Sequence, residues 1–252
     1  MIKFKNPPVI EVVSAVQWQP SLKPFSLPDA TLNKLLSDFT NKVAELDFCQ
    51  SERLIPAGVP IMPLQPVIKY SKIKGKTYFY QLGDGIFSAH AIQPYESWQE
   101  FKPVVKSGLE LLISLMPKEY NPFESASLRY IDAFKKDMLG NIKPYEFISI
   151  ILKVEPPKYL KDKSSVNLPS IQDIVIATQL KNNMNLLTIA REVIDSNSKE
   201  HMIILDNTVT ANGKLDVATN IIDSMNEAHG IISDIFIEIT KPIHENLGAY
   251  DV

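Results

Sequence analysis

The chain has 252 residues but a single cysteine, and this scarcity limits its chemistry. One cysteine allows neither a disulfide within the chain nor a cysteine-based metal site. Cys49 stands beside Phe48 after an apolar helical pattern, without a neighbouring cation that would make its thiol reactive. We therefore expect Cys49 to be a small packing residue.

Long apolar runs and arginine are also scarce. No apolar stretch approaches the roughly 18 residues that cross a bilayer, and residues 1–8 lack the apolar core of a signal peptide. Only three arginines occur, and 26 Lys+Arg against 29 Asp+Glu leave a net charge of −3. The sequence thus predicts a cytoplasmic protein without membrane contact, and it argues against a general nucleic-acid binder.

Signature motifs of catalysis are missing as well. The chain contains no G-x-S-x-G, H-E-x-x-H, Walker or C-x-x-C motif, and its G-x-G at 83–85 falls in an expected hairpin turn. The four histidines show no metal-ligand spacing; they are His90, His201, His229 and His244. We predict no cofactor and no metal site, and we expect His229 to be a packed or surface residue.

What the chain does contain is a clear order of secondary-structure patterns. The first half begins with a β-branched strand at 9–18 and a helix that Ser26 caps. Two or three antiparallel strands follow at 66–92, and a helix then runs from Ser97 to about Met116. This is a strand-helix-strands-helix unit.

The second half repeats this order. A strand is expected at 127–134 and a helix at 144–153, followed by a polar loop at 158–169. The remaining elements are three strands and one long helix, expected at 171–180, 184–194, 201–210 and 216–240. A single offset of 118 residues aligns Val9–Val16 with Ser127–Phe134, and it also relates the starts of the two closing helices. We interpret the repetition as an internal duplication.

The fold class that follows is α+β, with antiparallel sheets and helices packed on one face. The repeats are expected at 1–122 and 123–252, either as two domains or as one continuous domain. Their first strands should pair about a pseudo-twofold axis, which gives one long curved sheet with a free concave face. The element order resembles the saddle of the TATA-binding protein and the helix-grip folds, which implies a fold and no function.

The closing helix carries one apolar stripe. Its members step by four and three residues from Val217 to Ile239. We predict that the stripe lies on the sheet and that five of its residues are buried: Ile221, Met225, Ile232, Ile235 and Ile239.

The most suggestive local chemistry lies in the hairpin from Lys69 to Tyr80. Three lysines alternate there around a turn, and three tyrosines accompany them: Lys72, Lys74, Lys76, Tyr70, Tyr78 and Tyr80. Cations with interleaved aromatic rings suit single-stranded nucleic acid, through phosphate neutralisation and base stacking. The alternative is a solvated hairpin tip whose lysines protect a sheet edge from aggregation.

A second candidate group lies on the two first strands. Glu11 and Arg129 occupy equivalent positions, so we expect them to approach each other across the seam, within salt-bridge distance or through one water. The structural interpretation is a buried pair that fixes the register. The functional interpretation places Arg129, Tyr130 and Asp132 at the rim of a ligand site. The acidic residues Glu11, Asp132 and Asp206 also leave a carboxylate-based enzyme site open.

Three segments together carry a family resemblance. They are the opening Asn6–Val13, the central Leu128–Asp132 and the closing Ala228-His229 with Phe236–Thr240, and Tyr95 and Trp98 also fit. Over its whole length the chain resembles a sporadically distributed prokaryotic family of uncharacterised proteins of about this size. That family typically has Asn after the Leu-Arg-Tyr-Ile run, where this chain has Asp132. The resemblance implies relatives but no activity.

Three functions stay open on these grounds. A cytosolic binding or regulatory module, acting on a protein partner through the sheet or the long helix, fits the missing catalytic motifs. A single-stranded nucleic-acid-binding protein would use the Lys69–Tyr80 hairpin. An enzyme would need a carboxylate-based site in the cleft between the repeats. The candidate binding residues are Glu11, Lys72, Lys74, Lys76, Arg129, Tyr130 and Asp132.

Overall fold

The computed structural model describes residues 2–73, 77–117, 123–154, 173–195, 198–215 and 217–251. The loop expected at 158–169 lies outside these residues, as do Lys74, Lys76 and the expected first residue of the closing helix, Asp216.

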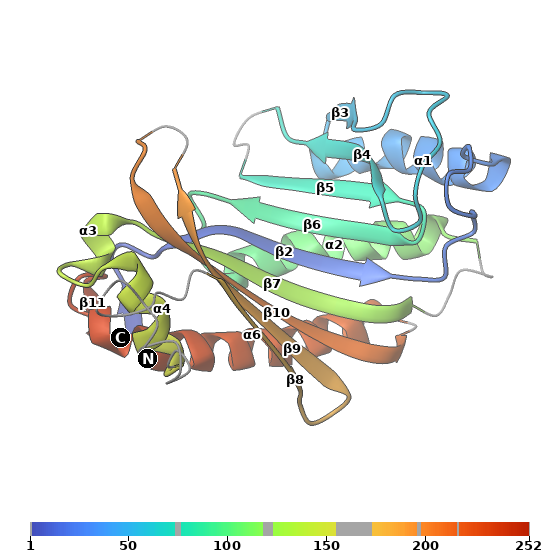
Figure 1. Cartoon of the computed structure of the whole chain (residues 1–252). Coiled ribbons are helices and arrows are strands. Elements are labelled where there is room, and N and C mark those ends of the chain that lie inside the picture. Colours follow the sequence, from blue (N-terminus) through green and yellow to red (C-terminus); the bar gives the residue numbers. More distant parts are fainter. Residues whose placement is uncertain are drawn as a thin grey trace.

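Most of the described strands belong to one sheet. They are β2 (Val9–Gln17), β3 (Gln50–Arg53), β4 (Pro66–Ser71), β5 (Tyr78–Gly83), β6 (Ile86–Ile92), β7 (Phe123–Phe134), β8 (Asp173–Gln179), β9 (Met184–Ile194) and β10 (His201–Leu215). Their order across the sheet is β3-β4-β5-β6-β2-β7-β10-β9-β8, and every neighbouring pair is antiparallel (Figure 1). A small separate sheet pairs β1 (Ile2–Phe4) with β11 (Ala249–Asp251).

Helices cover one face of the large sheet, as the sequence predicts. They are α1 (Ala30–Val43), α2 (Trp98–Leu115), α3 (Lys136–Leu139), α4 (Pro144–Leu152) and α6 (Ala218–Thr240), with the short 3-10 helices η1 (Ala44–Leu46) and η3 (Lys241–Ile243). In Figure 1, α1, α2 and α6 lie behind the sheet. On that side Val12 and Val16 are fully buried, whereas Val13 and Ala15 on the opposite side of β2 are only partly buried. The α+β class with helices on one face is confirmed, and we call the other side the open face.

The two first strands pair at the centre of this sheet, again as predicted. The register of β2 and β7 sets Val12 opposite Tyr130, so the residues at the middle of the seam are themselves 118 positions apart. Outward from the seam, the order is β6-β5-β4-β3 on one side and β10-β9-β8 on the other. One sheet therefore spans the expected boundary at 122/123, while duplication and the division into two repeats stay predictions.

Helix starts follow local capping chemistry. Ser97 caps α2 as predicted, because its Oγ accepts the Glu100 N–H at 3.3 Å. The expected Ser26 cap is wrong. Asp29 caps α1 instead, with its Oδ1 accepting the Leu32 N–H at 2.8 Å, while the Ser26 carbonyl accepts the Ile61 N–H. The helix α1 therefore begins at Ala30, directly after its cap Asp29.

The predicted apolar stripe of α6 is correct over its first part. Ile221, Met225 and Ile232 are buried against the sheet. Ile235 and Ile239 are only half-buried, so the stripe is wrong at its end. There Phe236, which lies outside the stripe, stacks on Phe134 with ring centroids 6.2 Å apart.

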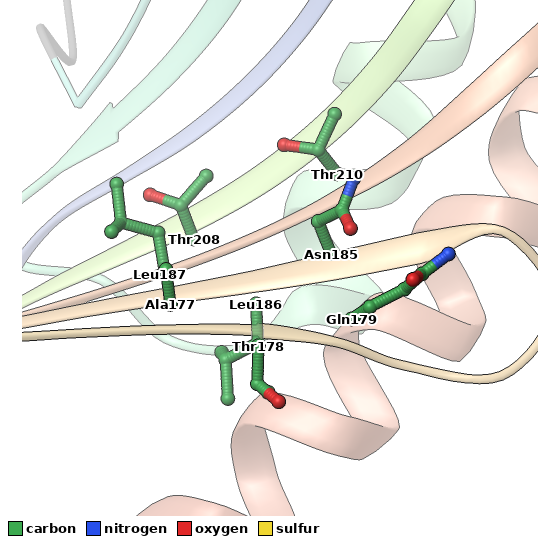
Figure 2. A pocket seen from close by; sticks show the side chains of 8 residues that line it. All are labelled: Ala177, Thr178, Gln179, Asn185, Leu186, Leu187, Thr208 and Thr210. Atoms are coloured by element: carbon green, nitrogen blue, oxygen red, sulfur yellow. The ribbon is translucent and has the colours of Figure 1, made fainter.

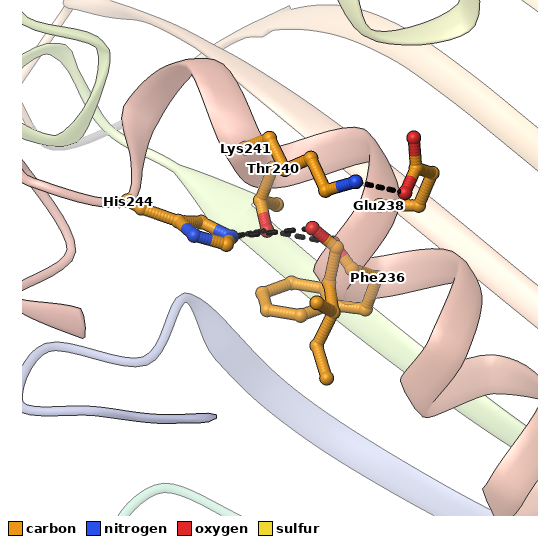
Figure 3. Close-up of polar contacts among 6 residues, drawn as sticks. Phe236, Glu238, Thr240, Lys241 and His244 are labelled. Atoms are coloured by element: carbon orange, nitrogen blue, oxygen red, sulfur yellow. Dashed lines mark hydrogen bonds and ion pairs between the residues drawn. The ribbon is translucent and has the colours of Figure 1, made fainter. Parts of the chain in front are cut away.

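The small β1–β11 sheet packs against the end of α6. Thr240 donates from Oγ1 to the Phe236 carbonyl at 2.6 Å and lies 3.2 Å from His244 Nε2 (Figure 3). Phe4 of β1 then packs edge-on against Phe236 and His244, with ring centroids 5.5 and 5.2 Å away. Lys241 and Glu238 form an ion pair on the outer surface of the same turn.

Cys49 does not pack inside, contrary to expectation. After η1 the chain turns through Asp47, whose φ of 70° is left-handed. This turn directs Phe48 into the core and leaves Cys49 exposed, with its Sγ 3.9 Å from the Ala44 carbonyl oxygen.

Two helical glycines should respond oppositely to alanine. A Cβ on Gly108 of α2 would lie 2.8 Å from both Phe87 Cζ and Tyr80 Cε1, which are buried rings that cannot withdraw. Gly108→Ala should therefore lower the free energy of unfolding by about 1–3 kcal/mol through overpacking. Gly230 of α6 has nothing within 4 Å of such a Cβ, so Gly230→Ala should raise it by about 1 kcal/mol through helix propensity. Urea unfolding of both variants measures this, and a stabilised Gly108→Ala would contradict the packing of α2.

Candidate functional site

A polar network crosses the open face at β6 and β2. Ser88 Oγ lies 2.8 Å from His90 Nε2, and His90 Nδ1 lies 2.8 Å from Glu11 Oε1. Ser88 and His90 share this face because residues two apart on a strand point the same way. Ser88 is 3% exposed and His90 is buried, whereas the Glu11 side chain is partly open to solvent.

The protonation of this network follows from the carboxylate. Its hydrogen bond with His90 lowers the pKa of Glu11 from its usual value, and the positive charges of Arg129 and Lys69 act in the same direction against the opposing effect of burial. An ionised Glu11 only accepts hydrogen bonds, so His90 Nδ1 must carry a proton. In neutral His90, Nε2 is then the acceptor and the Ser88 hydroxyl is the donor.

The direct salt bridge predicted between Glu11 and Arg129 does not form, although both side chains lie on the open face beside the seam. Arg129 instead forms a two-bond ion pair with Asp206 of β10, with Nε–Oδ1 and Nη2–Oδ2 distances of 2.8 and 2.5 Å. Glu11 lies opposite Ile131, and Arg129 lies opposite Val13, so the seam holds them diagonally. Each charge pairs with the next strand of its own half, and their mutual attraction acts at longer range.

The Glu11–His90 and Arg129–Asp206 contacts occupy corresponding positions on either side of the seam. His90 is opposite Val13, two residues beyond Glu11, and Asp206 is opposite Ile131, two residues beyond Arg129. In both halves a side chain of the first strand therefore contacts its outer neighbour diagonally, but the first strand supplies an acid in one half and a cation in the other. Arg129 and Asp206 neutralise each other, whereas Glu11 is hydrogen-bonded to a histidine.

An aromatic stack extends the network towards β4. Phe79 of β5 stacks on the His90 ring with centroids 4.3 Å apart, and Lys69 Nζ lies 4.2 Å from the Phe79 centroid. A cation over a ring face is attracted by the ring quadrupole. The stack covers one side of His90 and fixes the imidazole plane.

The tyrosines expected to bind bases are not available for stacking. Tyr70 and Tyr80 are fully buried on the helix-covered side, where Tyr80 donates to the Val104 carbonyl at 2.7 Å. Burial raises the pKa of Tyr70 to about 12. Tyr78 is stacked on Phe101. The hairpin therefore lacks the aromatic platform that the nucleic-acid hypothesis requires.

Lys72 is also engaged within the protein. Its Nζ lies 3.6 Å from Asp47 Oδ2 and 5.2 Å from the centroid of Phe48. Its intended companions Lys74 and Lys76 lie outside the described residues. Of the three lysines predicted to contact phosphate, the structure describes Lys72, and this residue is ion-paired with Asp47.

A second polar cluster lies beneath α6, on the helix-covered side of the seam. The Tyr95 and Tyr130 hydroxyls are 2.9 Å apart, and the Tyr130 hydroxyl is 3.0 Å from His229 Nδ1. His229 also stacks on Trp98, whose Nε1 donates to Asn226 Oδ1 at 2.8 Å. Residues from separate segments of the family resemblance thus meet in one place.

The groups of this cluster are held in their neutral forms. Burial, with Lys102 adding a smaller effect, lowers the pKa of His229. Burial likewise raises the pKa of Tyr130 strongly, and the neighbouring Tyr95 adds to this. The cluster is therefore an uncharged hydrogen-bonded contact between the seam and α6. His229 is a packed residue, as predicted.

Asp132 is a buried acid whose pKa is strongly raised. It is 3% exposed on the helix-covered side of β7, and within the described part of the chain its carboxyl group has no hydrogen-bond or ion-pair partner. Burial raises its pKa to about 8, and the negative charge of Asp206 adds to this. Asn207, one strand away, is also buried with Nδ2 lacking an acceptor.

The predicted ligand rim of Arg129, Tyr130 and Asp132 is therefore divided between the two sides of the sheet. Arg129 lies on the open face, and Tyr130 and Asp132 lie under the helices, because alternate residues of a strand point in opposite directions. For the same reason Asp132 and Asp206 do not face each other as a carboxylate pair. Glu11 and Asp206, in contrast, both lie in the open-face row of Ile131.

A shallow pocket of about 460 Å³ lies further out on the sheet, at β8, β9 and β10. Ala177, Leu187 and Thr208 occupy one row of it on the open face (Figure 2). Thr208 is opposite Arg129, so this row continues directly into the charged part of the seam. The lining combines methyl groups with side-chain hydroxyls and amides.

Sequence reasoning missed Ser88, and it named His90 only as one of four histidines without metal-ligand spacing. A period of two inside a predicted strand would have placed both side chains on one face. Their alignment with Glu11 depends on the strand register, which the sequence does not reveal.

The fold and these clusters define an α+β protein in which the described helices cover one face of the large sheet. No helix in the described ranges is long and apolar enough to cross a bilayer, and no metal-binding group of three or more His, Cys, Asp or Glu occurs among the same residues. No family model matches the chain, and no curated protein matches it.

A search of solved structures gives a weak similarity. The chain is similar to the di-domain ARO/CYC StfQ from the steffimycin biosynthetic pathway, with 8% identity over 94% of this chain and 98% of that chain. The TM-score is 0.20, which supports no inference about fold or function. The resemblance to the prokaryotic family stays a prediction.

Proposed function

We propose that the protein is a binding module that takes an extended segment of a partner protein along the edge strand β8. The observation that carries this proposal is the contrast between the two edges of the large sheet. An edge strand presents unpaired backbone N–H and C=O groups, and proteins normally protect it with charge, proline or short length.

The β3 edge is protected in this way. It has four residues, all exposed, and two of them are the charged Glu52 and Arg53. Such a strand disfavours the addition of another chain.

The β8 edge has no such protection. Its sequence Asp-Ile-Val-Ile-Ala-Thr-Gln contains no lysine and no proline, and Arg191 neutralises its one acidic residue, Asp173, at 3.1 Å. Within the described residues β9 is its sole neighbouring strand. Val175 is 63% exposed and Leu187 on β9 is 38% exposed, so the open face is apolar at this edge.

These features suit strand addition. Backbone hydrogen bonds to β8 would supply affinity, and alternate side chains of the added segment would contact the open face. The pocket at Ala177 and Leu187 adjoins this path and would accept an aliphatic side chain. An apolar centre with a polar rim is typical of protein interfaces.

Selection from a random heptapeptide phage library tests the proposal, because it samples extended segments of every side-chain pattern. The selected peptides should alternate apolar and polar residues. Val175→Lys places a protecting charge on the β8 edge and should weaken their binding about tenfold or more, measured by fluorescence anisotropy. Gln50→Lys adds the same charge to β3 and should leave the affinity unchanged.

Two outcomes would contradict this assignment. Equal binding to wild type and Val175→Lys would exclude the β8 edge as the site. A wild-type dimer in sedimentation that Val175→Lys dissociates would identify a second copy of this chain as the occupant instead. A cytoplasmic location accompanies the proposal as a prediction from the sequence.

A further inference from the structure

We propose that Ser88, His90 and Glu11 form an acyl-transfer site on the open face, in which Ser88 is the nucleophile. The site lies across the seam from the β8 edge and does not depend on the binding function proposed above. Its basis is the continuous chain of contacts Ser88 Oγ–Nε2 His90 Nδ1–Oε1 Glu11, with both distances at 2.8 Å.

The direction of the hydrogen bonds makes Ser88 reactive. Glu11 is an acceptor and requires the proton of His90 on Nδ1, so the free Nε2 lone pair faces the serine hydroxyl. A serine bonded to a histidine that a carboxylate orients is the arrangement that activates a hydroxyl nucleophile. The stacked Phe79 ring and Lys69 restrain the imidazole in this orientation.

The neighbours of Ser88 indicate the kind of substrate. Gln81 lies directly opposite on β5, half-buried, and its amide has no hydrogen-bond partner among the described residues. It is a donor for an oxyanion that forms beside Ser88. Ala15, opposite on β2, contributes only a methyl group on the other side. With Ser88 nearly buried, the site suits an ester with a small, uncharged acyl group.

The reaction balances with solvent water as the second substrate. Ser88 Oγ attacks the ester carbonyl carbon, a C–Oγ bond forms, and the hydroxyl proton moves to His90 Nε2. The ester C–O bond then breaks, and His90 returns this proton to the leaving alkoxide as an alcohol. Water gives a proton to His90 Nε2 and attacks the acyl carbon. The C–Oγ bond then breaks, His90 returns the proton to Ser88 Oγ, and the carboxylic acid leaves. Glu11 is a positioning residue that stabilises the transient imidazolium.

A fluorophosphonate probe tests the nucleophile directly, because it reacts with an activated serine by forming an Oγ–P bond and losing fluoride. Intact-mass measurement and peptide mapping should find one adduct, on Ser88. Ser88→Ala should remove the adduct. Ser127→Ala is the matched control, since Ser127 lies half-buried on the same face and has no histidine partner among the described residues. This variant should be labelled like wild type.

The roles of His90 and Glu11 are tested by the rate at which the fluorophosphonate probe labels Ser88. His90→Gln should slow labelling about 100-fold or more, the usual contribution of a general base. Glu11→Gln should also slow it and should change the ¹⁵N shifts of the His90 ring, because the Nδ1–H tautomer loses its acceptor. Circular dichroism checks that these variants are folded.

Several outcomes would overturn the proposal. A folded wild-type protein without an adduct on Ser88 excludes the nucleophile, and Ser88→Cys that reacts with iodoacetamide in that case shows a reachable but unactivated position. Labelling of Ser88 at the wild-type rate in His90→Gln excludes His90 as the general base. The same p-nitrophenyl acetate turnover in wild type and Ser88→Ala excludes acyl transfer at this residue.

Discussion

Replacing Ile232 by Asp is expected to unfold the protein at neutral pH. Ile232 is 2% exposed in the middle of α6, where the helix packs on β7 and β10. A carboxylate there would be buried without a cation, which costs several kcal/mol, while a domain of ordinary stability has about 5–15 kcal/mol in total. Circular dichroism at 25 °C and thermal melting measure the loss.

The control variant puts the same charge elsewhere on this helix. Asn220 is exposed in the first turn of α6, where a negative charge is favourable, so Asn220→Asp should keep or slightly raise the melting temperature. A soluble Ile232→Asp protein that melts like wild type would show that this side of α6 does not pack on the sheet.

Asp132→Asn should stabilise the protein, and the gain should grow with pH. The folded-state pKa of Asp132 is raised to about 8 from the usual 3.8 of an unfolded chain. Between these values the folded state holds a proton that the unfolded state releases, so wild-type stability is complete below about pH 4 and falls as pH rises to 8. At about 1.4 kcal/mol for each unit, the variant should gain several kcal/mol at pH 8.

Urea unfolding at intervals from pH 5 to pH 8 measures this difference. Asp234→Asn is the matched control, because Asp234 is exposed on α6 and the same substitution there should give no trend that depends on pH. Stability curves for wild type and Asp132→Asn that stay parallel over this range would show that Asp132 is not a buried, protonated acid. The test is also relevant to the family resemblance, because members of that prokaryotic family typically carry Asn at this position.

Periodicity is sufficient to predict the order of the elements and the pairing at the seam. It is insufficient wherever both sides of a strand are apolar. Val67 and Ile68 of β4 are both buried, as are Phe79 and Tyr80 of β5, so the pattern does not distinguish the two faces. For this reason the sequence pattern does not reveal that Tyr70 and Tyr80 of the hairpin belong to the core.

The candidate site is predictable only in its separate parts. Glu11, Arg129, Tyr130 and Asp132 can be identified from the strands, but their partners come from the diagonal neighbours that the register selects. The bulge at the start of β2, between Val9 and Glu11, shifts that register by one residue. Such a shift changes which side chains meet, and no local pattern reveals it.

The central position of β2 has a consequence for the speed of folding. Val12 pairs with Tyr130, so the seam closes a loop of more than a hundred residues, at an entropic cost of about 4 kcal/mol by the logarithmic rule. The β5–β6 hairpin closes over a two-residue turn, and β9–β10 are nearly as local. Local hairpins can therefore form in microseconds, while the sheet becomes continuous only when two distant parts of the chain meet.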